Sequence, residues 1–221
     1  MADNKNNTEK EKKGTKFSVG LGLLDYLNPI AYSTTSIIIL THVKDIFPKP
    51  SFLIYLAGVV LSMIFGFTIP TVKVLVGLGK FEFKMPVNFV FYVNFGILIS
   101  GTVLLYNFMH MKPIALIVML AAIVLFLAFI YAKTKKFNSV AVLTGSAGYI
   151  LIYISLIAAS LAKGMIAPVV LYAVAICLMI LLVCIGCFSN LYNARVHWVI
   201  EASNATCQTC VVIATFLLFC R

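Results

Sequence analysis

Four polar residues recur on one side of an apolar segment early in the sequence. The segment "LLDYLNPIAYSTTS" (23–36) carries them with the spacing i, i+3, i+7 and i+11, as Asp25, Asn28, Tyr32 and Ser36. In an α-helix this spacing places all four side chains on one face. A carboxyl group aligned with an amide and two hydroxyls could bind a small polar solute or a cation.

A second polar series lies near the end of the sequence. The segment "RVHWVIEASNATCQTC" (195–210) repeats the pattern at i, i+4, i+7 and i+11, with His197, Glu201, Asn204 and Gln208. Of the seven acidic residues, only Asp25 and Glu201 lie inside apolar segments. The two series are therefore the first candidates for a functional site.

The rest of the chain indicates that these series lie in a lipid bilayer. Hydrophobic residues make up 62% of the 221 residues and charged residues only 11%, whereas soluble domains carry roughly 25% charged residues. A span needs about 20 mostly apolar residues, and seven segments qualify: 17–41, 51–76, 86–109, 113–132, 138–161, 165–189 and 196–219. The sequence thus predicts an all-α, polytopic integral membrane bundle of about seven transmembrane helices.

The chain is expected to consist of a disordered N-terminal tail and a folded membrane domain. Residues 1–16 are polar and charged, which is typical of a disordered tail and not of a cleavable signal peptide. Residues 17–221 form the seven-helix membrane domain. The first segment fits a continuous transmembrane helix less well than the other six, because Asp25 and the Asn28-Pro29 step interrupt it.

The basic residues predict the orientation of this domain. Twelve Lys and Arg residues lie in the tail and in the loops on its side of the bundle, against five on the other side. Cytoplasmic loops carry the excess of Lys and Arg. We expect a cytoplasmic N-terminus, an external C-terminus and a location in the cell (inner) membrane.

The two carboxyl groups are expected to meet in a polar cavity that faces the cytoplasm, between the first, second and last helices. A charge at the bilayer centre costs about 2.5–3.5 kcal/mol even on insertion scales, so both series should turn away from lipid. Pro29 and Pro70 each remove a backbone hydrogen bond within a helix, which frees the carbonyl oxygens of Asp25 and Gly66 as further ligands. Such a cavity would hold a proton, an ammonium group or a metal cation on its carboxyl groups.

A purely structural role for the same residues is an open alternative. Asp25 would then pair with Lys73, and Glu201 with Arg195 or His197, only to hold the helices in register. Trp198, the only tryptophan, is interpreted as an anchor at the membrane interface.

The sequence contains few signs of other chemistry. Two CxxC pairs occur among the six cysteines, but the expected hairpin of the last two helices separates them by about 10 Å in depth. No metal site, catalytic residue or cofactor is therefore expected. Gly145 and Gly148 are interpreted as points of close helix packing.

Transport or permeation of a small solute or cation, with or without proton coupling, is the leading functional hypothesis. The alternative is a non-catalytic membrane sensor, regulator or subunit of a larger complex. An intramembrane enzyme ranks third. Apart from the lipid bilayer and the solute, a second copy of the chain or another membrane protein is an open possibility for a partner. Nucleic acid is not expected, because the basic residues lie between apolar segments and form no groove pattern.

Overall fold

A computed structural model describes residues 18–79, 87–188 and 194–220. The side chains of residues 87, 138, 186–188 and 194–197 lie outside this description. The described residues form eight α-helices: α2 (Val19–Asp25), α3 (Leu27–Val43), α4 (Lys49–Gly77), α5 (Val87–Phe108), α6 (Pro113–Thr134), α7 (Phe137–Ala162), α8 (Ile166–Phe188) and α9 (Ala194–Phe219). The disordered tail predicted for residues 1–16 lies outside the described residues.

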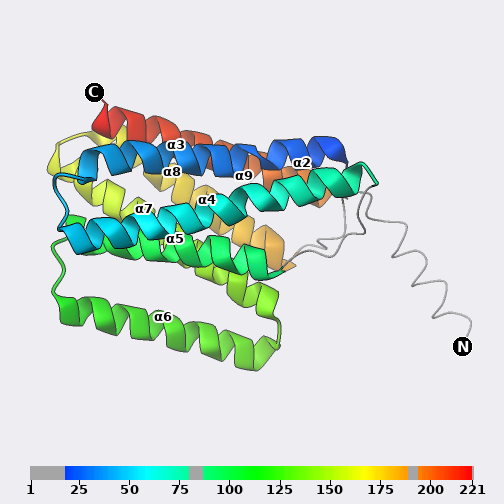
Figure 1. Cartoon of the computed structure of the whole chain (residues 1–221), viewed down its shortest axis with the longest axis horizontal. Helices are drawn as coiled ribbons and strands as arrows, with labels where there is room; N and C mark the ends of the chain where they lie inside the picture. The colour runs from blue at the N-terminus through cyan, green and yellow to red at the C-terminus, as the bar shows by residue number, and fades with distance from the viewer. Residues whose placement is uncertain (1–17, 80–86, 189–193, 221) are drawn as a thin grey trace, which may run out of the picture.

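Six of these helices, α4 to α9, are long and apolar enough to cross a membrane. They run roughly parallel or antiparallel to one another (Figure 1), and their bounds agree with the predicted spans to within a few residues. The fold is therefore all-helical in the described part of the chain, with the composition of a multi-pass membrane protein. The finer prediction of seven spans depends on the first segment.

That first segment is two helices instead of one. α2 has 7 residues and α3 has 17, and they lie end to end along α4 and α9 (Figure 1). The break falls at Tyr26, two residues earlier than the Asn28-Pro29 step. Pro29 instead occupies the first turn of α3, where a missing backbone N–H costs nothing.

The bundle is held together at several close crossings of helix backbones. The most extensive packing joins α5 to α7, and there a Cβ on Gly148 would lie 2.6 Å from the backbone nitrogen of Leu98. This confirms that Gly148 permits close packing. Small residues are the usual means of helix association in lipid, where tails and side chains are equally apolar.

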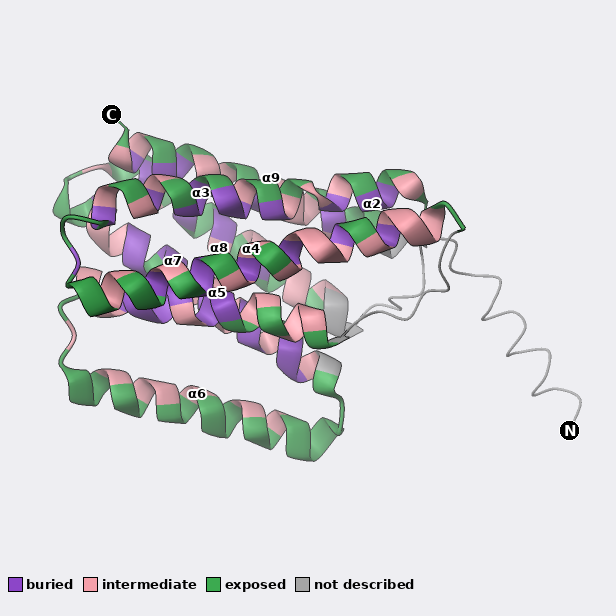
Figure 2. Cartoon of the chain, viewed as in Figure 1, coloured by how far each residue is buried: buried purple, intermediate pink, exposed green. Residues whose placement is uncertain are grey.

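Every described helix except α6 contributes buried residues (Figure 2). α6 differs from these helices. None of its residues, all of which the structure describes, is buried, and it packs mainly against α7. It lies at the edge of the bundle in Figure 1, so lipid or another protein must cover most of its surface.

Candidate functional site

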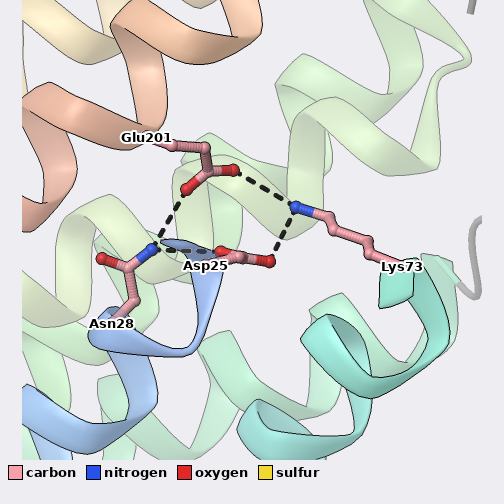
Figure 3. A network of polar contacts seen from close by, with 4 residues as sticks. All are labelled: Asp25, Asn28, Lys73 and Glu201. Carbon is pink, nitrogen blue, oxygen red and sulfur yellow. Dashed lines mark hydrogen bonds and ion pairs between the residues drawn. The ribbon is translucent and has the colours of Figure 1, made fainter. Parts of the chain in front are cut away.

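Four side chains from four helices form a closed polar network near one end of the bundle (Figure 3). The ammonium nitrogen of Lys73 lies 2.7 Å from Oδ2 of Asp25 and 3.2 Å from Oε1 of Glu201. The amide of Asn28 donates to the remaining oxygen of each carboxylate, over 3.1 Å in both cases. Two donors and two carboxylates thus alternate around the ring.

The backbone geometry of α2 brings this ring together. Asp25 is the last residue of α2, and Gly22 lies one turn earlier. A Cβ on Gly22 would lie 2.9 Å from the backbone nitrogen of Val74, so only glycine lets α2 approach α4 so closely. Lys73 is the neighbour of Val74, which explains how its side chain reaches Asp25.

The ring is shielded from solvent and carries unequal charge. Asp25, Lys73 and Glu201 are 8%, 6% and 6% exposed. With all three ionised, two negative charges face one positive charge, and the ring keeps one net negative charge. Buried charges of this kind are stable only when paired and hydrogen-bonded, and each oxygen of the two carboxylates has such a partner.

A cavity of about 180 Å³, which we call the main cavity, adjoins the ring. Asp25 and Asn28 form part of its wall, and Asn94, Tyr149 and Asn204 add polar groups from α5, α7 and α9. Roughly 10–15 Å³ suffices for one water, whereas pockets for drug-sized ligands start at about 300 Å³. The main cavity therefore suits a few waters or one small solute.

One acceptor in this wall has no protein partner. Oδ1 of Asn28 is buried and has no hydrogen-bond partner among the described residues, because the amide nitrogen of the same side chain is turned to the two carboxylates. An unpaired buried acceptor costs roughly 1–3 kcal/mol.

A second and much smaller space, the inner cavity, lies next to the main cavity. Its volume is about 10 Å³. Tyr32 and Tyr149 belong to the walls of both cavities, and the inner cavity adds polar groups of α3, α4, α7 and α9: Thr35, Ser36, Tyr55, Tyr153 and Gln208.

The structure distributes the residues singled out in the sequence over these features. Asp25, Asn28, Tyr32 and Asn204 line the main cavity, while Ser36 and Gln208 line the inner one. Glu201 lies behind Asp25 and Asn28 in the ring and is not part of the cavity wall. The side chains of Arg195 and His197 lie outside the described residues, so Lys73 is the cationic partner that the structure gives for Glu201.

Several residues of the site were missed in the sequence. Asn94 is a polar residue inside an apolar span, and this signal could have found it. Its amide donates to the carbonyl oxygen of Ala141 over 2.8 Å, which ties α5 to α7 beside the main cavity. Tyr149 and Tyr153 share one face of α7 at i and i+4, but tyrosine is too common in membrane helices to stand out.

None of the five cysteines whose side chains the structure describes lines either cavity. Cys207 is buried, and its thiol donates to the carbonyl oxygen of Ala175 over 3.4 Å. Among the described residues, no group of three His, Cys, Asp or Glu side chains could hold a metal ion.

Comparison with known proteins gives no match, whether to a family model, to a curated protein or to a solved structure. The interpretation of the site accordingly rests on its geometry and charge.

Proposed function

We propose that this protein transports a small, positively charged, hydrogen-bonding solute across a membrane. The observation that carries the proposal is that two members of the buried ring, Asp25 and Asn28, line a 180 Å³ cavity, while Lys73 and Glu201 complete the ring behind them. A ring that served only to join helices would need no cavity beside it. Asp25 and Asn28 line the cavity, so a solute in it would lie beside the ring.

The chemistry of the wall favours a cation over an anion. With its three charged groups ionised, the ring has a net negative charge, and it adds the carboxylate of Asp25 and the amide of Asn28 to the cavity wall. Asn94, Asn204 and Tyr149 supply further amide and hydroxyl oxygens. Charged donors form the stronger hydrogen bonds with such acceptors, so an ammonium or guanidinium group fits better than a carboxylate.

The resident ammonium of Lys73 suggests how binding and release would be coupled. An entering cation would share Asp25 with Lys73 and weaken their 2.7 Å ion pair. A proton taken up by Asp25 or Glu201 would have the same effect, and it would expel the bound cation. This competition gives a physical basis for proton coupling.

The same proposal includes the membrane topology. α2 and α3 together form the first of seven passes, because they lie end to end along α4 and α9. The excess of Lys and Arg on the side of the N-terminal tail places that side in the cytoplasm, with the C-terminus outside a cell (inner) membrane. The ring then lies in the cytoplasmic half, and the main cavity is accessible from the cytoplasm.

Uptake by proteoliposomes tests the proposal. Guanidinium is the probe because it keeps its charge at neutral pH, and urea is a neutral molecule of similar shape. We expect vesicles with the unaltered protein to take up guanidinium faster than urea, and Asp25→Asn and Glu201→Gln to abolish this difference. Asp45→Asn is the matched control, since the side chain of Asp45 is 84% exposed. Equal guanidinium uptake in unaltered, Asp25→Asn and Glu201→Gln vesicles of equal protein content would contradict transport through this site.

A membrane module that docks onto another protein, or onto a second copy of the chain, is the second candidate function. α6 favours it, because outside its contact with α7 this helix exposes large apolar side chains, among them Ile117, Leu125 and Phe129. Mild-detergent purification followed by mass measurement tests it. A stable stoichiometric partner without guanidinium uptake would favour the module over the transporter.

A further inference from the structure

We infer that the solute path does not end in the main cavity but continues into the inner cavity, and that Tyr32 and Tyr149 form the constriction between the two. This inference rests on the proposed function for the existence of a path. It adds a second polar site and the two side chains that decide what reaches it.

The contact of the two rings supports a constriction. Tyr32 of α3 and Tyr149 of α7 meet edge to face, with ring centroids 6.3 Å apart and ring planes at 89°. These two residues are the only ones that line both cavities among the described residues. A species that moves from the main cavity to the inner one must therefore pass between the two rings.

The two tyrosines differ in how firmly they are held. Tyr32 is buried, and its hydroxyl donates to Oγ of Ser100 over 3.3 Å. Tyr149 is only partly buried, and it lines the main cavity. Rotation of Tyr149 toward that cavity would join the two cavities without any movement of the helices.

The inner cavity has room for about one water, and polar side chains contribute to its wall. Its 10 Å³ is close to the roughly 10–15 Å³ that one water requires. The hydroxyl of Thr35, a residue that is 5% exposed, is buried there without a hydrogen-bond partner in the described part of the chain. Ser36, Tyr55 and Gln208 add further polar groups. The ligand class is a hydrogen-bonding species of the size of one water, either water itself or a small cation that has shed its hydration shell.

Beyond the inner cavity the path is closed. Ile39, Ile152 and Val211 complete its wall, and the buried side chains of Val43, Leu156 and Tyr172 follow toward the opposite end of the bundle. The structure thus corresponds to a state in which one end of the path is open as far as the tyrosine pair.

Cysteine accessibility tests the inference without knowledge of the natural solute. Asn204→Cys places a reporter in the main cavity, and Ser36→Cys places one in the inner cavity. The purified full-length protein is treated with 2-aminoethyl methanethiosulfonate, a small cationic thiol reagent. Peptide mapping by mass spectrometry reads the modification at the introduced position, so the native cysteines can stay.

We expect rapid modification of Asn204→Cys and only background modification of Ser36→Cys. Combining Ser36→Cys with Tyr149→Ala should raise its modification to the level of Asn204→Cys. Tyr149→Leu serves the same purpose if the alanine variant does not elute as a folded species. Tyr106→Ala is the matched control, because Tyr106 is, like Tyr149, a partly buried tyrosine and it lines neither cavity, and it should leave Ser36→Cys unmodified.

Two results would overturn the inference while leaving the proposed function intact. One is modification of Ser36→Cys at the rate of Asn204→Cys with both tyrosines present, which would mean that no constriction exists. The other is background modification of Ser36→Cys in the folded Tyr149 variants, which would mean that the cavities are not joined through this pair. Background modification of Asn204→Cys would instead contradict the open main cavity on which the proposed function depends.

Discussion

The ammonium nitrogen of Lys73 lies 2.7 Å from Oδ2 of Asp25, and this ion pair closes the gap between the end of α2 and the end of α4. The two side chains are only 8% and 12% exposed. This ion pair is therefore buried, in contrast to the 4.0 Å contact between Lys44 and Asp45, whose side chains are mostly exposed.

Lys73→Met should strongly destabilise the protein. The substitution leaves the buried carboxylates of Asp25 and Glu201 without a cation, and removal of one partner from a buried ion pair costs about 3–5 kcal/mol. Thermal unfolding in detergent, followed by the loss of monodisperse protein, measures the effect. Lys44→Met is the control and should leave the midpoint unchanged. Equal midpoints for the two variants would mean that the ring does not hold the helices together.

Neutralising the whole ring should separate its structural role from its role in transport. In the triple variant Asp25→Asn, Lys73→Met and Glu201→Gln, no charge remains to be compensated. Replacement of an entire buried ion-pair network by neutral groups is often tolerated, so the midpoint should recover toward that of the unaltered protein. Guanidinium uptake should stay at the level of empty vesicles. Recovery of uptake together with stability would show that the charges are not needed for transport.

Much of this architecture could be predicted from the sequence, because hydrocarbon imposes simple rules. Apolar segments of sufficient length marked the bounds of α4 to α9. The cost of burying charge predicted that Asp25 and Glu201 turn inward, and both are buried. A pairing of Asp25 with Lys73 was among the alternatives drawn from the sequence.

The remaining parts of the site depend on how helices pair, which residue spacing does not encode. The polar residues of α5 and α7 are scattered along both helices, so the sequence could draw attention to Asn94 but could not show that Asn94 and Tyr149 line the same cavity. The role of Asn28 as a bridge between two carboxylates required the relative position of α3 and α9. The close approach of α2 to α4 depends on Gly22, and nothing in the sequence distinguishes this residue from the other 12 of the 13 glycines.

Gly22→Ala should disrupt the ion pair of Asp25 and Lys73, although Gly22 is not part of the ring. The new Cβ would lie 2.9 Å from the backbone nitrogen of Val74, so α2 must move away from α4 and carry Asp25 away from Lys73. Overpacking of this kind typically costs about 1–3 kcal/mol. Gly20→Ala is a control in the same helix, since its Cβ would make only ordinary contacts, with Trp198 at 3.8 Å and Oγ of Ser18 at 3.9 Å. We expect lower thermal stability and slower guanidinium uptake for Gly22→Ala alone. If Gly20→Ala and Gly22→Ala behave alike, the close approach of α2 and α4 has no part in the site.

Asn204→Ala should weaken solute binding without affecting the fold. Asn204 lies in the wall of the main cavity but outside the ring of Asp25, Asn28, Lys73 and Glu201. Loss of one hydrogen bond to a charged ligand costs about 1.5–3 kcal/mol, so the guanidinium concentration for half-maximal uptake should rise roughly ten- to a hundredfold, while the thermal midpoint stays constant. Asn107→Ala is the matched control, because Asn107 bonds to the carbonyl oxygen of Val103 within α5 and lines neither cavity. If Asn204→Ala does not change the guanidinium concentration for half-maximal uptake, the cation does not bind in the main cavity.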